Sequence, residues 1–425
     1  MMLAKIEEKI KALGCDIWEL TENTERGWEF YFIRHELDQN RITDVRTISV
    51  KLYRTLDQGM LGSASGEISP TAGDAEIEKT LSDIYFQASL AKNPAYSLND
   101  KPVQSPELQE IDTAAIAKDF ITAMAEVRET ETEDINSYEI FVKEITRHYL
   151  NSNGVDYTVR FPSSMIEVVL NARTGDHEIE LYRMYRSGTC DQEKLRRDVE
   201  QVLQYAKDRL HTEPTPKLGT FDVLFSTDDA AEIYDYFVTK TSADMIYRHL
   251  SDWTPGKEVA EYAGGDRISL KAVSSLANSS ADYPIDTEGA EIRDRFLVEQ
   301  GVTKNNWGHR QFCQYLGSGD SSVVRNIVVE GGSKSEAEIR QGDYLEVVEF
   351  SDFQVSPMGG DIAGEIRLGY LHQDGKVRIV SGGSVTGQMS EAIPTMEFSK
   401  ETEQYDTVVI PRVTKLKNLT ITGIA

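Results

Sequence analysis

The second half of the chain constrains the fold most, because from Asp266 onward it consists of short segments with the composition of β-strands. These segments are rich in β-branched and aromatic residues, and stretches that contain glycine separate several of them. The turn at residues 372–375 contains Asp-Gly, which is typical of a hairpin between antiparallel strands. We therefore expect residues 216–425 to form a β-rich, mostly antiparallel domain. Its strands are expected at residues 267–273, 296–298, 327–329, 344–350, 366–371, 377–380 and 407–410.

The first half of the chain contains the same order of elements twice. Apolar residues at helical spacing predict a helix over residues 3–13, and strands and a second helix follow it. A linker rich in proline, serine and aspartate, residues 94–108, separates this unit from a second one of the same order. We therefore expect an α+β protein. Its N-terminal domain, residues 1–215, is expected to contain two copies of one unit, residues 1–95 and 110–212, that arose by duplication. The other expected helices cover residues 74–92, 112–128 and 191–210. The expected strands cover residues 28–33, 45–53, 137–144, 155–161, 164–170 and 177–185, and residues 61–66 are expected to form a strand or a turn.

A segment with two prolines, residues 212–217, marks the boundary between the two domains. The strand expected at residues 221–225 opens the second domain. Thr227 follows it as a candidate helix N-cap, with two aspartates in the first turn. We expect this helix to continue to about Leu250.

The acidic composition excludes some classes of function. The chain has 45 Lys and Arg residues against 71 Asp and Glu residues, a net charge of −26. Such a surface repels phosphate backbones and no basic run offsets it, so we expect no direct nucleic-acid binding. No apolar run is long enough to predict a membrane span or a signal peptide. Cys15, Cys190 and Cys313 are scattered, so we expect reduced thiols in a cytoplasmic protein.

A series of short motifs recurs in a fixed order in the second half. YPIDTEG (residues 283–289) leads into the expected strand FLVEQG, and four further stretches follow: RNIVVEGG (325–332), SPMGGDI (356–362), SGGS (381–384) and KNLTITG (417–423). This series resembles the TldD/PmbA family, once described as modulators of DNA gyrase and better understood as a metallopeptidase system. The resemblance covers most of the chain and is strongest from Asp266 to the end.

The resemblance implies a protein without the metal site of the family. Metal-binding members carry His-Glu-x-x-x-His on a helix in mid-chain and a Cys ligand shortly before the last strand. The corresponding segment here contains no histidine; Ala231, Glu232 and Asp235 stand at the position of the motif, and no cysteine follows Cys313. Because a zinc site needs converging imidazole, thiolate or carboxylate ligands, we expect no catalytic residue and no cofactor in this chain. It resembles the PmbA/TldE type of subunit.

Other candidate ligands have simple structural explanations. His309 and Cys313 are four residues apart and could share one helix face as metal ligands, but ordinary packing explains them as well. His177 and Glu178 begin like the metal motif, yet they lie on an expected strand. The charged residues 35–41 are expected to form a solvated turn.

Three functions are compatible with these features. The first is a PmbA/TldE-like subunit that pairs with a TldD-like metallopeptidase subunit, helps to enclose a chamber and binds unfolded peptide substrates by strand addition. The second is a peptidase in its own right with atypical ligands, and the third is a homodimeric binding or scaffold protein. Apolar segments such as residues 344–350 and 296–298 lead us to expect a dimer with most of its interface in the second domain.

Overall fold

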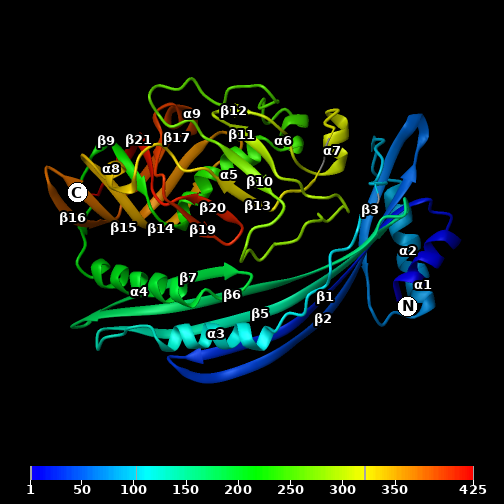
Figure 1. Ribbon diagram of the computed structural model, residues 1–425, viewed down its shortest axis with the longest axis horizontal. Coiled ribbons are helices and arrows are strands. Elements are labelled where there is room, and N and C mark those ends of the chain that lie inside the picture. The colour runs from blue at the N-terminus through cyan, green and yellow to red at the C-terminus, as the bar shows by residue number, and fades with distance from the viewer. Residues whose placement is uncertain (1, 102, 320–321, 425) are drawn as a thin grey trace.

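The structure is a computed structural model that describes residues 2–101, 103–319 and 322–424. Three sheets make up the fold: a long curved sheet from the first half of the chain and two sheets from the second half, which lie above it in Figure 1. The expected strand-rich α+β class is confirmed. Within the described ranges, no helix is both long and apolar enough to cross a membrane.

The sheet of the first half has seven antiparallel strands in the order β4-β3-β2-β1-β5-β6-β7. A helix, three long strands and a second helix come from each half of this region, and the two sets meet where β1 pairs with β5. Such an arrangement is what a duplication would produce. The elements are α1 (Met2–Ala12), β1 (Ile17–Ile33), β2 (Glu36–Thr55), β3 (Met60–Ile68), α2 (Asp74–Ala88), β4 (Asn93–Pro94), α3 (Thr113–Ala125), β5 (Glu133–Asn151), β6 (Asp156–Thr174), β7 (His177–Ser187) and α4 (Gln192–Arg209), with a short η1 (Asp57–Gly59).

Each pair of helices covers its own part of one face of this sheet. Leu3, Ile6 and Ile10 of α1 are buried against β1, β2 and α2, as their helical spacing predicts. In the second unit, α3 and α4 pack on β5 and β6 around Phe120 and Val199. These two helices begin where expected because the side chains of Asp112 and Asp191 accept hydrogen bonds from backbone N–H groups of their first turns.

Several strands are longer than the sequence indicates. The two strands predicted at residues 155–161 and 164–170 form one strand, β6, which passes through Pro162. This is possible because β7 pairs only with residues 164–174 of β6, so proline interrupts no ladder on that side. The predicted solvated turn at residues 35–41 was wrong from Glu36 onward, because β2 begins there and pairs with β1. The backbone pairing forms a strand although its side chains are polar and exposed.

Five strands of the second half form a closed barrel. The sheet order is β14-β9-β21-β17-β15, and β14 also pairs with β15, which closes the ring; β16 and β8 extend from β15, and β18 pairs with β21. The hairpin predicted at the Asp-Gly turn is confirmed, with Asp374 and Gly375 both at positive φ. The strands are β8 (Glu213–Pro214), β9 (Gly219–Phe225), β14 (Tyr344–Val355), β15 (Asp361–Gln373), β16 (Lys376–Ser381), β17 (Ser384–Gln388), β18 (Glu397–Phe398) and β21 (Thr414–Thr422).

A six-stranded sheet packs with the barrel around one large core, in the order β12-β11-β10-β13-β20-β19. Leu297, Val298, Tyr344 and Val347 are at most 2% exposed. The apolar segments from which we expected an interface are therefore buried within the chain itself. The strands are β10 (Leu270–Val273), β11 (Arg295–Glu299), β12 (Val302–Thr303), β13 (Asn326–Val329), β19 (Thr402–Tyr405) and β20 (Val408–Pro411), with short helices α7 (Arg310–Tyr315), α8 (Glu336–Ile339), α9 (Met389–Ala392) and η3 (Ile393–Thr395).

The helix predicted from Thr227 to Leu250 is broken into three parts: η2 (Asp228–Ala230), α5 (Ala231–Lys240) and α6 (Ala243–Tyr247). The break lies at two hydroxyl residues. The Thr241 hydroxyl donates to the Val238 carbonyl at 2.8 Å, and the Ser242 hydroxyl accepts from the Met245 N–H at 3.3 Å. These side chains compete for the backbone groups of the helix, end α5 and start α6.

Candidate functional site

Helix α5 contains Ala231, Glu232 and Asp235, the positions at which we expected the metal motif of the family. Its inner face, with Ile233, Tyr234 and Phe237, is buried in the core of the second domain. The Tyr234 hydroxyl lies 2.7 Å from the Thr414 hydroxyl on β21. Glu232 and Asp235 project from the opposite, exposed face. Helical periodicity therefore fixes which side chains of this helix can meet a partner or a substrate.

A glycine loop, residues 356–360, lies against the end of α5. The Lys240 ammonium group at the end of α5 donates to the carbonyl oxygens of Leu250 and Met358, both at 3.0 Å, and so ties this loop to the segment that follows α6. Gly360 has a φ of 77°, and a Cβ there would lie 3.3 Å from the Tyr236 hydroxyl. The glycine is required by this turn and by the close approach of α5. Burial lowers the pKa of Lys240.

The exposed face of α5 does not fit a zinc site. Burial raises the pKa of Asp235, and burial followed by the charge of Asp235 raises the pKa of Glu232, so neither carboxylate is held in its charged form by a cationic neighbour. With Glu232 at the glutamate of the motif, the motif's spacing places its second histidine at the buried Tyr236 rather than at Asp235. Across the described ranges, no group of three or more His, Cys, Asp or Glu side chains could hold a metal ion.

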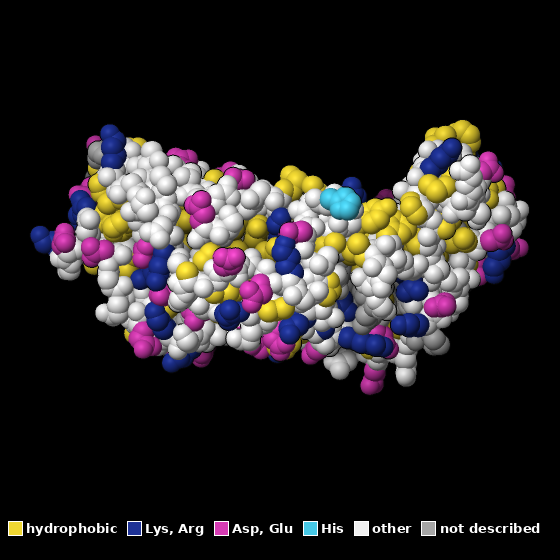
Figure 2. Space-filling model, turned by 90° about the horizontal axis from the view of Figure 1, so that it is seen from above, with side chains coloured by type: hydrophobic (Ala, Val, Ile, Leu, Met, Phe, Trp, Pro, Cys, Tyr) yellow, Lys and Arg dark blue, Asp and Glu magenta, His cyan; other side chains and the backbone are white. Residues whose placement is uncertain are grey.

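An aromatic cluster, defined here as Tyr247, Phe312 and Tyr315, lies at the junction of α6 and α7. The ring centroids of Tyr247 lie 5.7 Å from Phe312 and 4.9 Å from Tyr315. Tyr247 is 37% exposed. Leu250 and Met358, whose carbonyl oxygens accept the hydrogen bonds from Lys240, are 41% and 61% exposed. Figure 2 shows apolar side chains gathered where this side of the molecule is hollowed. Such surfaces are typical of protein or peptide contacts.

A buried ion pair joins the two halves of the chain next to the start of α5. Arg183 on β7 donates to Glu349 on β14, with Nη1 3.2 Å from Oε2, and the two side chains are 19% and 5% exposed. In the turn before α5, burial and the charge of Asp228 raise the pKa of Asp229 to about 7. The end of the N-terminal sheet is thus fixed against the segment that positions α5.

His309 and Cys313, the candidate metal pair, have different partners. His309 precedes α7, and its Nδ1 lies 3.0 Å from Glu288 Oε1, while the Arg310 N–H donates to Glu288 Oε2 at 2.8 Å. Cys313 is buried, with its thiol 3.6 Å from the Gly308 carbonyl. The hydrogen bond with Glu288 raises the pKa of His309. Burial acts to raise the pKa of Glu288, but the bonds from His309 and Arg310 lower it overall.

Sequence reasoning did not find that Glu288 lies close enough to Lys51 of the N-terminal half for their charges to interact. On the N-terminal side, the buried Glu19 accepts hydrogen bonds from Tyr53 and, at 2.7 Å, from Tyr149. The Lys51 ammonium group lies 3.7 Å from Glu19. Asp286 accepts three backbone N–H bonds, and burial raises its pKa to about 6. The YPIDTEG motif was the available signal, because its two carboxylates form these contacts.

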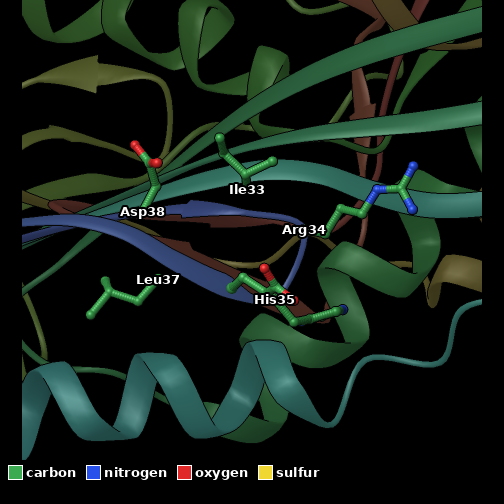
Figure 3. Close-up of a pocket in the computed structure, with 6 residues that line it drawn as sticks. Ile33, Arg34, His35, Leu37 and Asp38 are labelled. Carbon is green, nitrogen blue, oxygen red and sulfur yellow. The ribbon is translucent and has the colours of Figure 1, made fainter.

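The remaining candidates lie on the surface. His177 and Glu178 are exposed at the start of β7. His35 lies in the turn between β1 and β2, with its Nε2 2.9 Å from Glu129. An open hollow of about 510 Å³ is lined by residues 33–38 (Figure 3). Figure 3 shows Ile33 and Asp38 on one side of the hairpin and Leu37 and His35 on the other, so these side chains do not converge on one point.

The fold and α5 define a class: a strand-rich protein whose second half packs a helix without histidine against both a closed five-stranded barrel and a six-stranded sheet. Residues 218–423 match the family described as the PmbA/TldA metallopeptidase C-terminal domain. This is the family that the motifs resemble, and the predicted resemblance is confirmed. No curated protein sequence matches the chain.

Solved structures share the fold over the whole chain. TldE from Thermococcus kodakarensis is 18% identical, with a TM-score of 0.78, over 99% of this chain and 100% of that one. A proposed modulator of a DNA gyrase from Thermotoga maritima is 14% identical, with a TM-score of 0.77 and the same coverage. Another from Bacteroides thetaiotaomicron is 16% identical, with a TM-score of 0.79, over 99% of this chain and 98% of that one. At these identities the likeness shows a shared fold.

Proposed function

We propose that this chain is the PmbA/TldE-like, metal-free subunit of a TldD/PmbA peptidase system. The observation that carries the proposal is the composition of α5. The motif resemblance aligns this helix with the family's metal helix, but it presents Glu232 and Asp235 and has no histidine. Zinc in catalytic sites takes three protein ligands and one open position, which this face does not supply. The chain accordingly contributes no catalytic residue and no cofactor.

In this role the chain pairs with a TldD-like subunit in the cytoplasm, helps to enclose a chamber and holds unfolded peptide for hydrolysis by its partner. The aromatic cluster with Leu250 and Met358 supports this role, because it is a partly exposed apolar surface beside α5. Peptides in extended conformation bind through their backbone groups and need no fixed side chain. Closure of the barrel by β14 and β15 leaves those two strands without a free edge along their shared ladder.

Metal analysis and activity of mixtures test the proposal. The purified chain is expected to contain no stoichiometric zinc or iron and to hydrolyse unfolded casein only when a TldD-like protein is added. The matched control is the same mixture with the TldD-like histidines replaced, which should be inactive. About one tightly bound zinc per chain, lost in His309→Ala or Cys313→Ala, would contradict the proposal and favour a peptidase with atypical ligands.

A further inference from the structure

The distal half of β2 has a strand neighbour on one side only. β1 pairs with residues 36–53 of β2, whereas β3 pairs only with residues 48–55. Residues 36–47 therefore form an edge, and β2 follows the lower margin of the sheet in Figure 1. All of residues 36–46 except Thr43 are exposed. An edge of this length is an interaction surface unless something protects it.

The register shows which backbone groups of this edge are free. The Arg34 N–H donates to the Asn136 carbonyl on the β5 side. The backbone N–H and C=O groups of even-numbered residues of β1 therefore point toward β5, and those of odd-numbered residues point toward β2. Glu29 pairs with Arg41, which directs the odd-numbered residues of β2 toward β1. At the far end, the Leu56 N–H donates to the Met60 carbonyl, in agreement with this alternation. The N–H and C=O groups of Asn40, Ile42, Asp44 and Arg46 therefore point outward.

This edge has only part of the usual protection against pairing, namely five charged side chains and a β-bulge at Asp38. Residues 36–47 contain no lysine and no proline. Its charged side chains are in part neutralised within the hairpin, because Asp44 pairs with Arg26 at 3.4 Å and Arg46 pairs with Glu22. Ile42 is 71% exposed at the centre of the segment. An apolar residue with free backbone groups on both sides of it favours addition of a further strand.

We propose that this edge pairs with the same edge of a second copy of the chain, antiparallel, with the two-fold axis at Ile42. In antiparallel strands, the side chains of directly opposite residues lie on the same face of the sheet. A two-fold axis that pairs one residue with its own copy therefore keeps each face of the sheet continuous across the two chains. Centring on Ile42 sets Ile42 against Ile42, Asn40 against Asp44 and Arg41 against Thr43. No like charges are opposed, and each pair is of a type that stabilises or tolerates pairing.

The neighbouring registers are less favourable. Centring on Arg41 sets two guanidinium groups against each other, and centring on Asp44 does the same with two carboxylates. Centring on Thr43 sets Ile42 against a carboxylate. The self-complementary sequence thus selects a second copy as the occupant. The pairing uses no residue of α5, the aromatic cluster or the glycine loop, and it is independent of the proposed function.

Two measurements on the full chain test the pairing. Light scattering should give a mass twice the 47.8 kDa of one chain. Ile42→Lys places two ammonium groups at the axis and should raise the dimer dissociation constant at least about tenfold through like-charge repulsion. Leu90→Lys is the matched control, because Leu90 is 70% exposed at the end of α2, and it should leave the constant unchanged.

Cross-linking supplies a second criterion that does not depend on the lysine variant. Cα atoms of a hydrogen-bonded antiparallel pair are about 5.5 Å apart, a separation that a disulfide can span. Ile42→Cys should therefore form a covalent dimer under mild oxidation, whereas Leu90→Cys should not. A monomeric wild type, a dimer only with a TldD-like protein, or a dimer that Ile42→Lys leaves intact and Ile42→Cys fails to link would overturn the proposal. Metal content separates this result from failure of the proposed function.

Discussion

The ion pair between Arg183 and Glu349 should contribute strongly to the attachment of the two halves of the chain. Arg183→Met removes the cation and leaves a carboxylate that is only 5% exposed. Losing one partner of a buried pair costs about 3–5 kcal/mol, and because Arg183 is 19% exposed we expect the lower end, about 3 kcal/mol. Urea unfolding followed by far-ultraviolet circular dichroism measures this loss. Arg186→Met, an exposed arginine on the same strand, should stay within about 0.5 kcal/mol.

The reason for the loss predicts a rescue and a pH dependence. Glu349→Gln in the Arg183→Met background removes the unpaired charge and should restore most of the stability. Burial raises the pKa of Glu349 even beside Arg183, and without Arg183 the pKa rises further. A carboxyl with a raised folded-state pKa binds protons more tightly when folded, so stability falls as pH rises above the unfolded value of about 4.3. The deficit of Arg183→Met should be larger at pH 8 than at pH 5. A loss below about 1 kcal/mol, or no rescue, would refute the reasoning.

Two further predictions concern His309 and nucleic acid. The pKa of His309 is raised by Glu288, so its stabilisation is present below the unfolded pKa of about 6.5 and is lost as pH rises through the folded value. Because the His309 side chain is 57% exposed, wild type should exceed His309→Ala by at most about 1 kcal/mol at pH 5.5 and by less at pH 8, measured by urea unfolding at both pH values. The net charge of −26 predicts no binding of duplex DNA at physiological salt; a sub-micromolar, salt-sensitive shift in a gel assay would contradict this.

Local patterns in the sequence were sufficient for many elements. The helical spacing of Leu3, Ile6 and Ile10 and the hydrogen-bonded cap at Asp191 involve residues within one turn of each other, so α1 and α4 could be predicted. The same holds for the hairpin at Asp374. The break of the predicted long helix at Thr241 depended on side-chain hydrogen bonds, which propensity alone does not resolve.

Strand length depended on pairing rather than on composition. Residues 36–41 are polar and exposed, yet they form the start of β2 because β1 supplies backbone hydrogen bonds. The division of the chain near residue 215 and the duplication of its first half stay proposals. Separate unfolding transitions for the two halves, or an N-terminal fragment that folds alone, would support them.

The sequence by itself determined that no histidine occurs at residues 227–237 and that no cysteine follows Cys313. It also determined the family resemblance, through motifs whose order is a property of the chain. Only the tertiary structure decided that Glu288 meets His309, that Arg183 meets Glu349 across 166 positions, and that β14 closes the barrel on β15. These contacts join segments far apart in sequence, and their free energy arises from burial and pairing that no local pattern records.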